Sequence, residues 1–351
     1  MSKPAFANAL IDWYVNNHRE LPWRNTTDPY KIWLSEIILQ QTRVMQGLPY
    51  YQKFVETFPT VQSLAQAEEK AVLRLWQGLG YYSRARNLHK CARTIVNEHY
   101  GKFPSTFQSL QRLPGIGPYT AAAIASFAFN EAVPVIDGNV FRVLARVFGI
   151  EDDIAGHDAR SVFFAKASQL IDPDRPGDFN QAIMELGATC CTPANPRCVE
   201  CPLQKICVAR RHEIQHLLPV KSKKTTVRKR YLHYFVIKHR QKILLRHRTG
   251  KDIWQDLYDF YCIETKRSVN PEKIIQSDPR LKNVLVKKIS KPLKHVLSHQ
   301  WLLACFYEAT VRPGHTIRLE KDYRWVPVSQ LAEWPKPILI HNYLKQQGLV
   351  T

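Results

Sequence analysis

The chain lacks a long apolar run and an apolar N-terminal leader, and it is short of acidic residues. The absence of such segments predicts neither a membrane span nor secretion, so we expect a cytosolic protein, nucleoid-associated in a bacterium or nuclear in a cell with a nucleus. Only 30 Asp and Glu stand against 50 Lys and Arg, which gives a formal charge of +20. This balance favours a polyanionic partner, although a basic ribosomal or membrane-surface protein would share it.

Cysteine is sparse outside one segment, which excludes a disulfide framework. Cys191, Cys198, Cys201 and Cys207 follow one another as Cys-x6-Cys-x2-Cys-x5-Cys, directly after a predicted helix. Four thiolates in so short a span predict tetrahedral zinc or an iron–sulfur cluster. One short pair with long flanks favours the cluster, because zinc usually takes two short pairs. Cys190 is a rival ligand, although it breaks the spacing.

With 351 residues the chain is long enough for two domains, and 45% hydrophobic residues with 8 Trp indicate folded cores rather than a basic tail. We expect residues 1–212 to be almost wholly helical and residues 231–351 to mix strands with helices. Between them, residues 213–230 form a basic linker. Its charge is typical of a solvated tether that adds nonspecific nucleic-acid affinity; a nuclear signal is the second interpretation.

A glycine hairpin stands near the middle of the chain, with Gly115 and Gly117 spaced by one residue. If both take a positive φ, they form a tight turn that another molecule can approach closely. Pro118 suits the first position of a helix over 118–129. The start of that helix would attract an anion, and on a basic protein the natural anion is a nucleic-acid phosphate. A plain interhelical turn is the alternative.

A buried carboxylate is predicted on the helix that Asp28 and Pro29 open. This helix, expected to run to about Met45, is apolar nearly all round and therefore buried. Burial of Glu36 would raise its pKa and suit it to general acid catalysis. The alternative is a structural glutamate that reaches the surface or pairs with an arginine.

Asp137 precedes Gly138, Asn139 and an apolar helix over 138–148. It is a natural N-cap. A carboxylate fixed there, near a phosphate-binding hairpin, would also stabilise a developing cation. The spacing leaves both roles open.

A glycine-flanked pair of tyrosines, Tyr81 and Tyr82, interrupts the helices that lead to Tyr100. Such a pair can stack on bases or wedge into a duplex. In a turn of this kind, aromatic residues also commonly belong to the core.

Together, residues 113–119, Asp137 and the cysteine spacing resemble the helix-hairpin-helix base-excision glycosylases that carry a [4Fe-4S] cluster. Residues 33–42, 78–87 and 136–140 resemble one branch, the adenine DNA glycosylases of the MutY type. Relatives of the endonuclease III type form a Schiff base through a lysine where this chain has Tyr119. The resemblance therefore implies base removal without strand cleavage.

The resemblance also implies roles for individual residues. Glu36 would protonate the adenine, and Asp137 would stabilise or trap the cationic sugar. Tyr119 and Asn139 would orient that carboxylate and the water. The other expected contacts are Arg19, Trp23 and Gln181 with the flipped adenine, and Gln41, Thr42, Leu79, Tyr81, Gly115, Gly117, Ser298 and His299 with the DNA.

The C-terminal part resembles the Nudix-like domain of the same family, which reads 8-oxoguanine opposite the adenine. Strands are predicted over 231–237, 242–245 and 301–310, and a helix over 338–347. The Nudix hydrolase box is absent, so we expect no pyrophosphatase activity. Residues 295–299 match the recognition loop, with Leu297 where phenylalanine is usual. Because leucine is smaller than phenylalanine, we expect the loop to pack differently around Leu297.

The expected fold is a mainly α N-terminal region, two helical lobes with a [4Fe-4S] loop at 191–207, followed by an α+β Nudix-like domain. The expected function is hydrolysis of the N-glycosidic bond of adenine opposite 8-oxoguanine or guanine in double-stranded DNA, by a monomer. Two alternatives remain. One is a glycosylase with lyase activity on oxidised pyrimidines, which Tyr119 and the extra domain disfavour. The other is a non-catalytic iron–sulfur protein that scans DNA or senses redox state.

Overall fold

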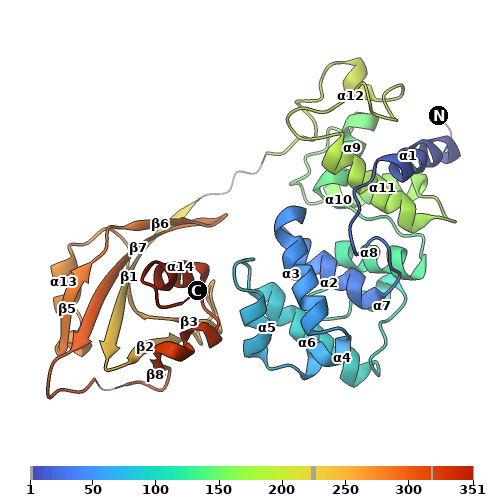
Figure 1. Ribbon diagram of the computed structural model, residues 1–351. Coiled ribbons are helices and arrows are strands. Elements are labelled where there is room, and N and C mark those ends of the chain that lie inside the picture. Colours follow the sequence, from blue (N-terminus) through green and yellow to red (C-terminus); the bar gives the residue numbers. More distant parts are fainter. Residues whose placement is uncertain (1–2, 223–226, 318, 351) are drawn as a thin grey trace. The chain divides into compact units, whose positions relative to one another are not determined.

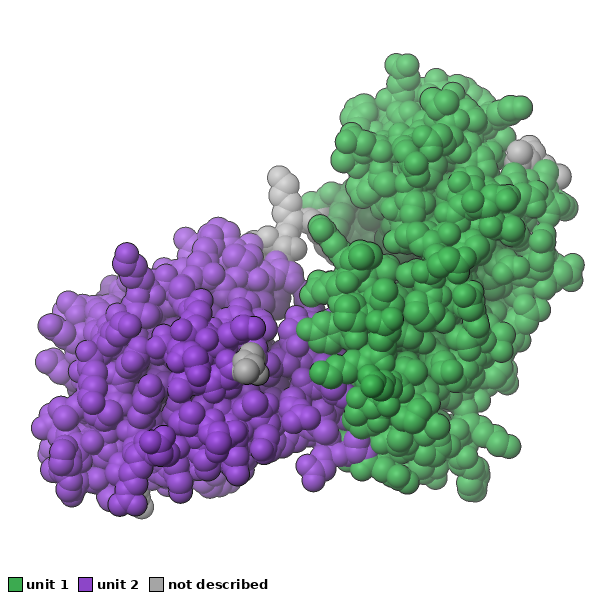
Figure 2. Space-filling view, viewed as in Figure 1, with its two compact units in different colours: residues 1–66, 87–223 green, residues 67–86, 224–351 purple. Residues whose placement is uncertain are grey.

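The computed structural model describes residues 3–222, 227–317 and 319–350 (Figure 1). The chain divides into two compact units, coloured separately in Figure 2: Met1–Gln66 with Asn87–Lys223, and Ala67–Arg86 with Lys224–Thr351. The second unit thus includes residues 67–86, which were expected in the first domain. Within the expected linker 213–230, residues 223–226 lie outside the described residues, and a strand begins at Arg228.

The regular structure of the first unit, as far as it is described, is helical. Its helices are α1 (Lys3–Asn17), α2 (Pro29–Leu39), α3 (Val44–Thr57), α4 (Val61–Gln66), α6 (Ser83–Glu98, entering from the second unit), α7 (Phe107–Leu110), α8 (Pro118–Phe129), α9 (Gly138–Phe148), α10 (Ala159–Leu170), α11 (Pro176–Thr189) and α12 (Val208–Arg211). Throughout the described part of the chain, every helix is too short or too polar to cross a membrane.

Helix α2 begins as the sequence predicts and ends earlier. The side chain of Asp28 accepts a hydrogen bond from the backbone of Tyr30, and Pro29 is the first helical residue. The helix is buried on nearly every side, which confirms the interpretation of its apolar sequence. It stops at Leu39 rather than near Met45, because Gln41 adopts a φ of +54°, which no right-handed helix accommodates.

The second unit is built on a mixed sheet. Its strands are β1 (Arg228–His239), β2 (Lys242–His247), β3 (Tyr258–Asp259), β4 (Tyr261–Thr265), β5 (Val284–Ile289), β6 (Leu293–Val296), β7 (Gln300–Val311) and β8 (Tyr323–Pro327). The main order is β3-β2-β1-β7-β5, while β4 pairs with β1, β6 with β7 and β8 with β2. Its helices are α5 (Glu69–Leu75), α13 (Pro271–Gln276), the short 3₁₀ turns η1 (Pro279–Leu281) and η2 (Val328–Glu333), and α14 (Ile338–Gln346).

Alternation along β1 gives the sheet two apolar faces. On one face, Tyr234 stacks with Phe306, and Phe306 stacks with Tyr343 of α14 at a ring separation of 4.0 Å. On the other face, Phe235 stacks on Tyr307 in a cluster that includes residues of α13. Helices therefore cover both faces of this sheet, as expected for an α+β domain.

Strands β1 and β7 run parallel, with Arg228 opposite Gln300 and Lys238 opposite Thr310. At the start of the pair, the backbone N–H of Arg228 donates to the carbonyl of His299 at 3.1 Å. Residue 299 ends the segment predicted as the recognition loop. The parallel register therefore sets the first residue of β1 beside that loop.

Candidate active site

Glu36 is buried in the first unit, with 7% of its surface exposed, and it contacts a neighbouring helix. The hydroxyl of Tyr119, the second residue of α8, donates to Oε2 of Glu36 at 2.7 Å. Burial raises the pKa of Glu36 to about 7, and the charge of Asp137 raises it further, whereas the Tyr119 hydrogen bond and the charge of Arg24 lower it. A carboxyl group with this pKa can hold and release a proton near neutral pH.

Asp137 is the N-cap of α9, as predicted. Its Oδ1 accepts the backbone N–H of Val140 at 2.7 Å, and its Oδ2 accepts the side-chain amide of Asn139 at 2.9 Å. Burial raises the pKa of Asp137, and these two hydrogen bonds oppose that rise. Asp137 can therefore cap α9 and also act beside Glu36, because it is close enough for its charge to raise the pKa of Glu36.

Tyr119 and Asn139 divide their contacts between the two carboxyl groups. Asn139 orients Asp137, as expected, while the bond that Tyr119 makes goes to Glu36. Sequence reasoning missed the residue behind Asn139: Nη2 of Arg142 donates to Oδ1 of Asn139 at 2.8 Å and to the carbonyl of Gly187 at 2.7 Å. Two arginines, Arg142 and Arg146, on a helix that is otherwise apolar from Val140 onward were the available signal.

A groove of about 520 Å³ opens beside this site. Tyr119 and Ile136 line it, together with Pro118 at the start of α8 and Arg160 on α10. Glu36 and Asp137 do not line this groove; among its lining residues, Tyr119 is the one whose hydroxyl contacts Glu36.

The residues expected around an adenine are tied together by a carboxylate that sequence reasoning overlooked. Glu185 on α11 is fully buried and accepts Nε and Nη2 of Arg19, each at 2.7 Å, and Nη2 of Arg24 at 2.6 Å. Although burial acts in the opposite direction, these hydrogen bonds lower the pKa of Glu185 to about 2. Arg19 is thus fixed by an ion pair, which its expected role did not include.

Trp23 and Gln181 also have defined partners in this unit. Trp23 packs edge-on against Tyr51 at a ring separation of 5.0 Å. The side-chain oxygen of Gln181 accepts the hydroxyl of Tyr14 at 2.8 Å. A lone acid among the apolar residues in the middle of α11 was the signal that would have found Glu185 and, through it, Arg24.

The hairpin uses its two glycines differently. Gly115 has a φ of +75°, and a Cβ there would lie 2.6 Å from Cβ of Asn87. Gly117 caps α8 with a φ of −88°, so of the two glycines only Gly115 uses the positive φ that glycine permits. A Cβ on Gly117 would meet nothing within 4 Å. Because Gly117 has no side chain, a ligand can approach the backbone at the start of α8.

Gln41 and Thr42 form the exposed turn that separates α2 from α3. The positive φ of Gln41 is uncommon for a residue other than glycine. The hydroxyl of Thr42 donates to the carbonyl of Gln40 at 3.3 Å. The turn follows directly on the helix that carries Glu36, so these residues lie on the same part of the unit as the acid.

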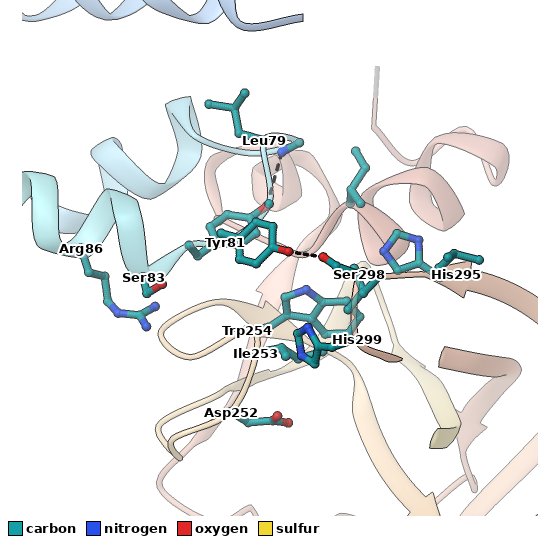
Figure 3. Close-up of a pocket in the computed structure, with 16 residues that line it drawn as sticks. Leu79, Tyr81, Ser83, Arg86, Asp252, Ile253, Trp254, His295, Ser298 and His299 are labelled. Atoms are coloured by element: carbon teal, nitrogen blue, oxygen red, sulfur yellow. Dashed lines mark hydrogen bonds between the residues drawn. The ribbon is translucent and has the colours of Figure 1, made fainter. Parts of the chain in front are cut away.

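A cavity of about 420 Å³ lies in the second unit, between residues 78–83, residues 252–254 and the loop 295–299 (Figure 3). Tyr81 is 40% exposed with a φ of +47°, and its hydroxyl bonds to the Ser298 hydroxyl. Tyr82 is buried, so only one of the two tyrosines belongs to the core. Leu79 is buried as well, whereas Ser298 and His299 are exposed on the cavity wall.

Five cysteines line one small apolar cavity of the first unit: Cys190, Cys191, Cys198, Cys201 and Cys207. Within residues 3–222 and the rest of the described chain, no three potential ligands converge as they would on a single metal ion. Nη1 of Arg146 donates to Sγ of Cys191 at 3.5 Å, and Nε2 of Gln215 donates to Sγ of Cys198 at 3.8 Å. Thiols around an apolar space, with donors aimed at two of the sulfur atoms, form a lining that an iron–sulfur cluster fits.

Comparison with known proteins agrees with this architecture. Residues 34–168 match the HhH-GPD superfamily of base excision DNA repair proteins, and residues 233–346 match the NUDIX domain. The chain is 39% identical over 266 residues to an adenine DNA glycosylase of Buchnera aphidicola subsp. Schizaphis graminum, covering 74% of this chain and 76% of that relative. It is 47% identical over 223 residues to the human adenine DNA glycosylase, covering 61% of this chain and 41% of that relative.

Among solved structures, a thermostable thymine-DNA glycosylase superposes with a TM-score of 0.55 at 26% identity, covering 60% of this chain and 97% of that one. The match confirms the helix-hairpin-helix glycosylase fold predicted for the helical region. The aligned residues span about two fifths of the human relative and three quarters of the bacterial one. On the strength of the bacterial alignment and the two domain matches, the chain belongs to the adenine DNA glycosylase family of base excision repair enzymes.

Proposed function

We propose that this chain is a monofunctional DNA glycosylase that hydrolyses the N-glycosidic bond of adenine mispaired with 8-oxoguanine or guanine. It acts as a monomer on double-stranded DNA in the nucleoid or nucleus, and it flips the adenine out of the duplex before the bond breaks. The names of the relatives, adenine DNA glycosylase, support adenine as the nucleobase that is removed. The buried carboxyl group of Glu36 supports acid-catalysed cleavage of the bond.

The observation that carries the proposal is the environment of Glu36. Its raised pKa keeps part of the population protonated at neutral pH, so the carboxyl group can give its proton to a ring nitrogen of adenine and make the base a better leaving group. Departure of the base leaves an oxocarbenium-like sugar. Asp137, held by Asn139 and the start of α9, is the carboxylate that stabilises this cation.

Tyr119 supports the monofunctional assignment. A Schiff base needs an amine, and at this position the side chain is a phenol that is committed to Glu36. Hydrolysis by water is therefore the reaction that these side chains favour over lyase chemistry.

The cavity of the second unit supports recognition of the opposite base. Tyr81, Ser298 and Trp254 give it hydroxyl groups and an aromatic wall, which suit a purine. We assign the reading of 8-oxoguanine or guanine to this cavity and to its loop 295–299.

We assign a [4Fe-4S] cluster to Cys191, Cys198, Cys201 and Cys207. Such a cluster supplies a rigid structural anchor and an electron-transfer centre when it is bound. The backbone carbonyl of Cys191 accepts Nε of Arg142 at 2.7 Å, and Arg142 also holds Asn139. This chain's own residues thereby connect the cysteine segment to the carboxylate that faces the sugar.

The experiment is a single-turnover assay on a duplex with one adenine opposite 8-oxoguanine, with adenine opposite guanine in parallel and adenine opposite thymine as the control. We expect the adenine strand of both mispairs to break only after alkali, which reveals the abasic site. Glu36→Gln should abolish that product.

Two outcomes would overturn the proposal. Strand breakage without alkali, together with an adduct trapped by borohydride, would establish a lyase. Tight binding with an intact cluster and no excision would establish a non-catalytic DNA-binding protein.

A further inference from the structure

An ion-pair network centred on the buried Arg230 lies in the second unit, on the strand β1 that pairs with β7 directly after the loop 295–299. Arg230 is 8% exposed and donates to both oxygens of Asp252 at 2.9 and 2.8 Å. It also donates to both oxygens of Glu264 at 2.8 and 2.6 Å. Four hydrogen bonds to two carboxylates fix the plane of this guanidinium group. The group can therefore orient a further side chain that contacts it.

The side chain of Gln300 contacts Arg230, and only one orientation of its amide group gives a hydrogen bond there. The side chain is 4% exposed, and Oε1 accepts Nη1 of Arg230 at 3.4 Å. A guanidinium group only donates, so the amide oxygen has to face Arg230 and the NH₂ group has to face away. That NH₂ group lies 3.0 Å from Nε2 of His299.

We propose that Gln300 holds His299 in the tautomer that carries its proton on Nδ1. The Gln300 amide nitrogen can only donate, so Nε2 of His299 accepts, and a neutral imidazole then has its proton on the other nitrogen. Without this bond, a neutral histidine in water favours the opposite tautomer. Gln300 is thus a positioning residue that acts through the ring of His299.

The consequence is a directed hydrogen-bond donor at the cavity. His299 is exposed and lines the cavity together with Tyr81, Trp254 and Ser298, all of which are labelled in Figure 3. With Nε2 engaged by Gln300, Nδ1–H is the polar group of the ring that is left for a ligand, and as a donor it suits a carbonyl oxygen. 8-Oxoguanine carries a carbonyl at C8 that guanine lacks, and a site built to bind such an acceptor discriminates against the analogue without it. This assignment of the ligand rests on the proposed function, whereas the tautomer does not.

The first arm of the test measures the tautomer without DNA. Histidine ¹⁵N shifts are recorded for the full chain at a pH where His299 is neutral, and the His299 signals are identified by their loss in His299→Ala. We expect Nε2 to have the shift of an acceptor nitrogen and Nδ1 that of a protonated one. Gln300→Leu should move His299 to the Nε2–H form, while Gln330→Leu, at an exposed glutamine of the same unit, should not. An Nε2–H signal in the unmodified chain overturns the proposal.

The second arm measures affinity for adenine-containing duplexes with 8-oxoguanine or guanine opposite. Gln300→Leu should lower the preference for 8-oxoguanine about five- to tenfold, the effect of one hydrogen bond. On a His299→Ala background the same substitution should change nothing. A further drop on that background would mean that Gln300 supports the loop without acting through His299. If the chain excises no adenine, the proposed function fails, and the ¹⁵N arm still decides the tautomer.

Discussion

The hydroxyl of Tyr119 donates to Glu36 from the second residue of α8, two residues after the glycine that caps the same helix. One short segment therefore contains both the bare helix start, which suits a phosphate, and the partner of the acid. A duplex held at Gly117 is thereby placed at a fixed separation from Glu36. In the proposed reaction, the helix start that would bind a phosphate and the hydroxyl group that holds Glu36 thus belong to one helix.

Replacing Glu36 by glutamine should lower the single-turnover excision rate by at least two orders of magnitude, because the amide cannot supply the proton. Duplex affinity should change by less than about threefold, since this buried side chain makes no contribution to phosphate binding. Rates come from quenched-flow excision and affinities from equilibrium titration. Loss of binding would assign Glu36 a structural role.

The excision rate should fall as the pH rises through about 7, because Glu36 loses the proton that it must donate. The Tyr119 hydrogen bond lowers the pKa of Glu36. Tyr119→Phe should therefore move this limb of the profile to higher pH. A limb that stays in place, or moves to lower pH, would contradict the assignment of Glu36 as the titrating acid.

Folding stability should depend on pH through the same group. The folded-state pKa of about 7 exceeds the ordinary value of 4.5, so the contribution of Glu36 is complete below pH 4.5 and is lost as the pH rises through 7. This shift corresponds to about 3 kcal/mol. Glu36→Gln should remove that loss, so its free energy of unfolding should exceed that of the parent chain at pH 8. Urea titrations at pH 5 and pH 8 test the difference.

Alanine substitutions at the two hairpin glycines should separate folding from binding. Gly115→Ala combines a positive φ with a contact 2.6 Å from Asn87, and should cost about 1–3 kcal/mol of stability. Gly117→Ala has an allowed φ and open space, so its melting temperature should match that of the parent chain. Its duplex affinity should nevertheless fall, because the new methyl group stands where a phosphate approaches. Equal affinities for Gly117→Ala and the parent would rule out close contact at this helix start.

Substitution of Cys198 by alanine should abolish iron binding and the visible absorbance of a cluster. Cys305→Ala, at a half-buried cysteine of β7, is the matched control and should keep the full iron content. Cys190→Ala tests the rival ligand: its thiol donates to the carbonyl of Arg197 at 3.4 Å, and we expect iron to remain. Iron loss in Cys190→Ala would change the proposed ligand set.

Local signals were enough to predict the bounds of two helices beside the site. The bounds of α8 and α9 coincide with the predicted 118–129 and 138–148 because their ends are marked by residues with defined backbone preferences. Pro118 and Asp137 begin these helices, and Asn130 and Gly149 end them in the left-handed conformation. Such punctuation needs no knowledge of the tertiary fold.

Interactions between residues far apart in the sequence could not be predicted from such local signals. Arg19 and Glu185 are 166 residues apart, and nothing local to either one indicates the other. The strands β3, β4, β5, β6 and β8 were not predicted, because they are 2–6 residues long and their sequences alternate weakly. The grouping of residues 67–86 with the second unit likewise depends on packing rather than on a composition shift.

The parallel pairing of β1 with β7 also has a kinetic consequence. The contact between Arg230 and Gln300 joins residues 70 positions apart, so the intervening chain has to close a long loop before it can form. Contacts of this kind form late and slowly. The contact that holds Gln300, the residue after the segment 295–299, therefore forms only once β1 and β7 have paired. If the proposed recognition of the opposite base is right, it depends on a contact that a partly folded second unit lacks.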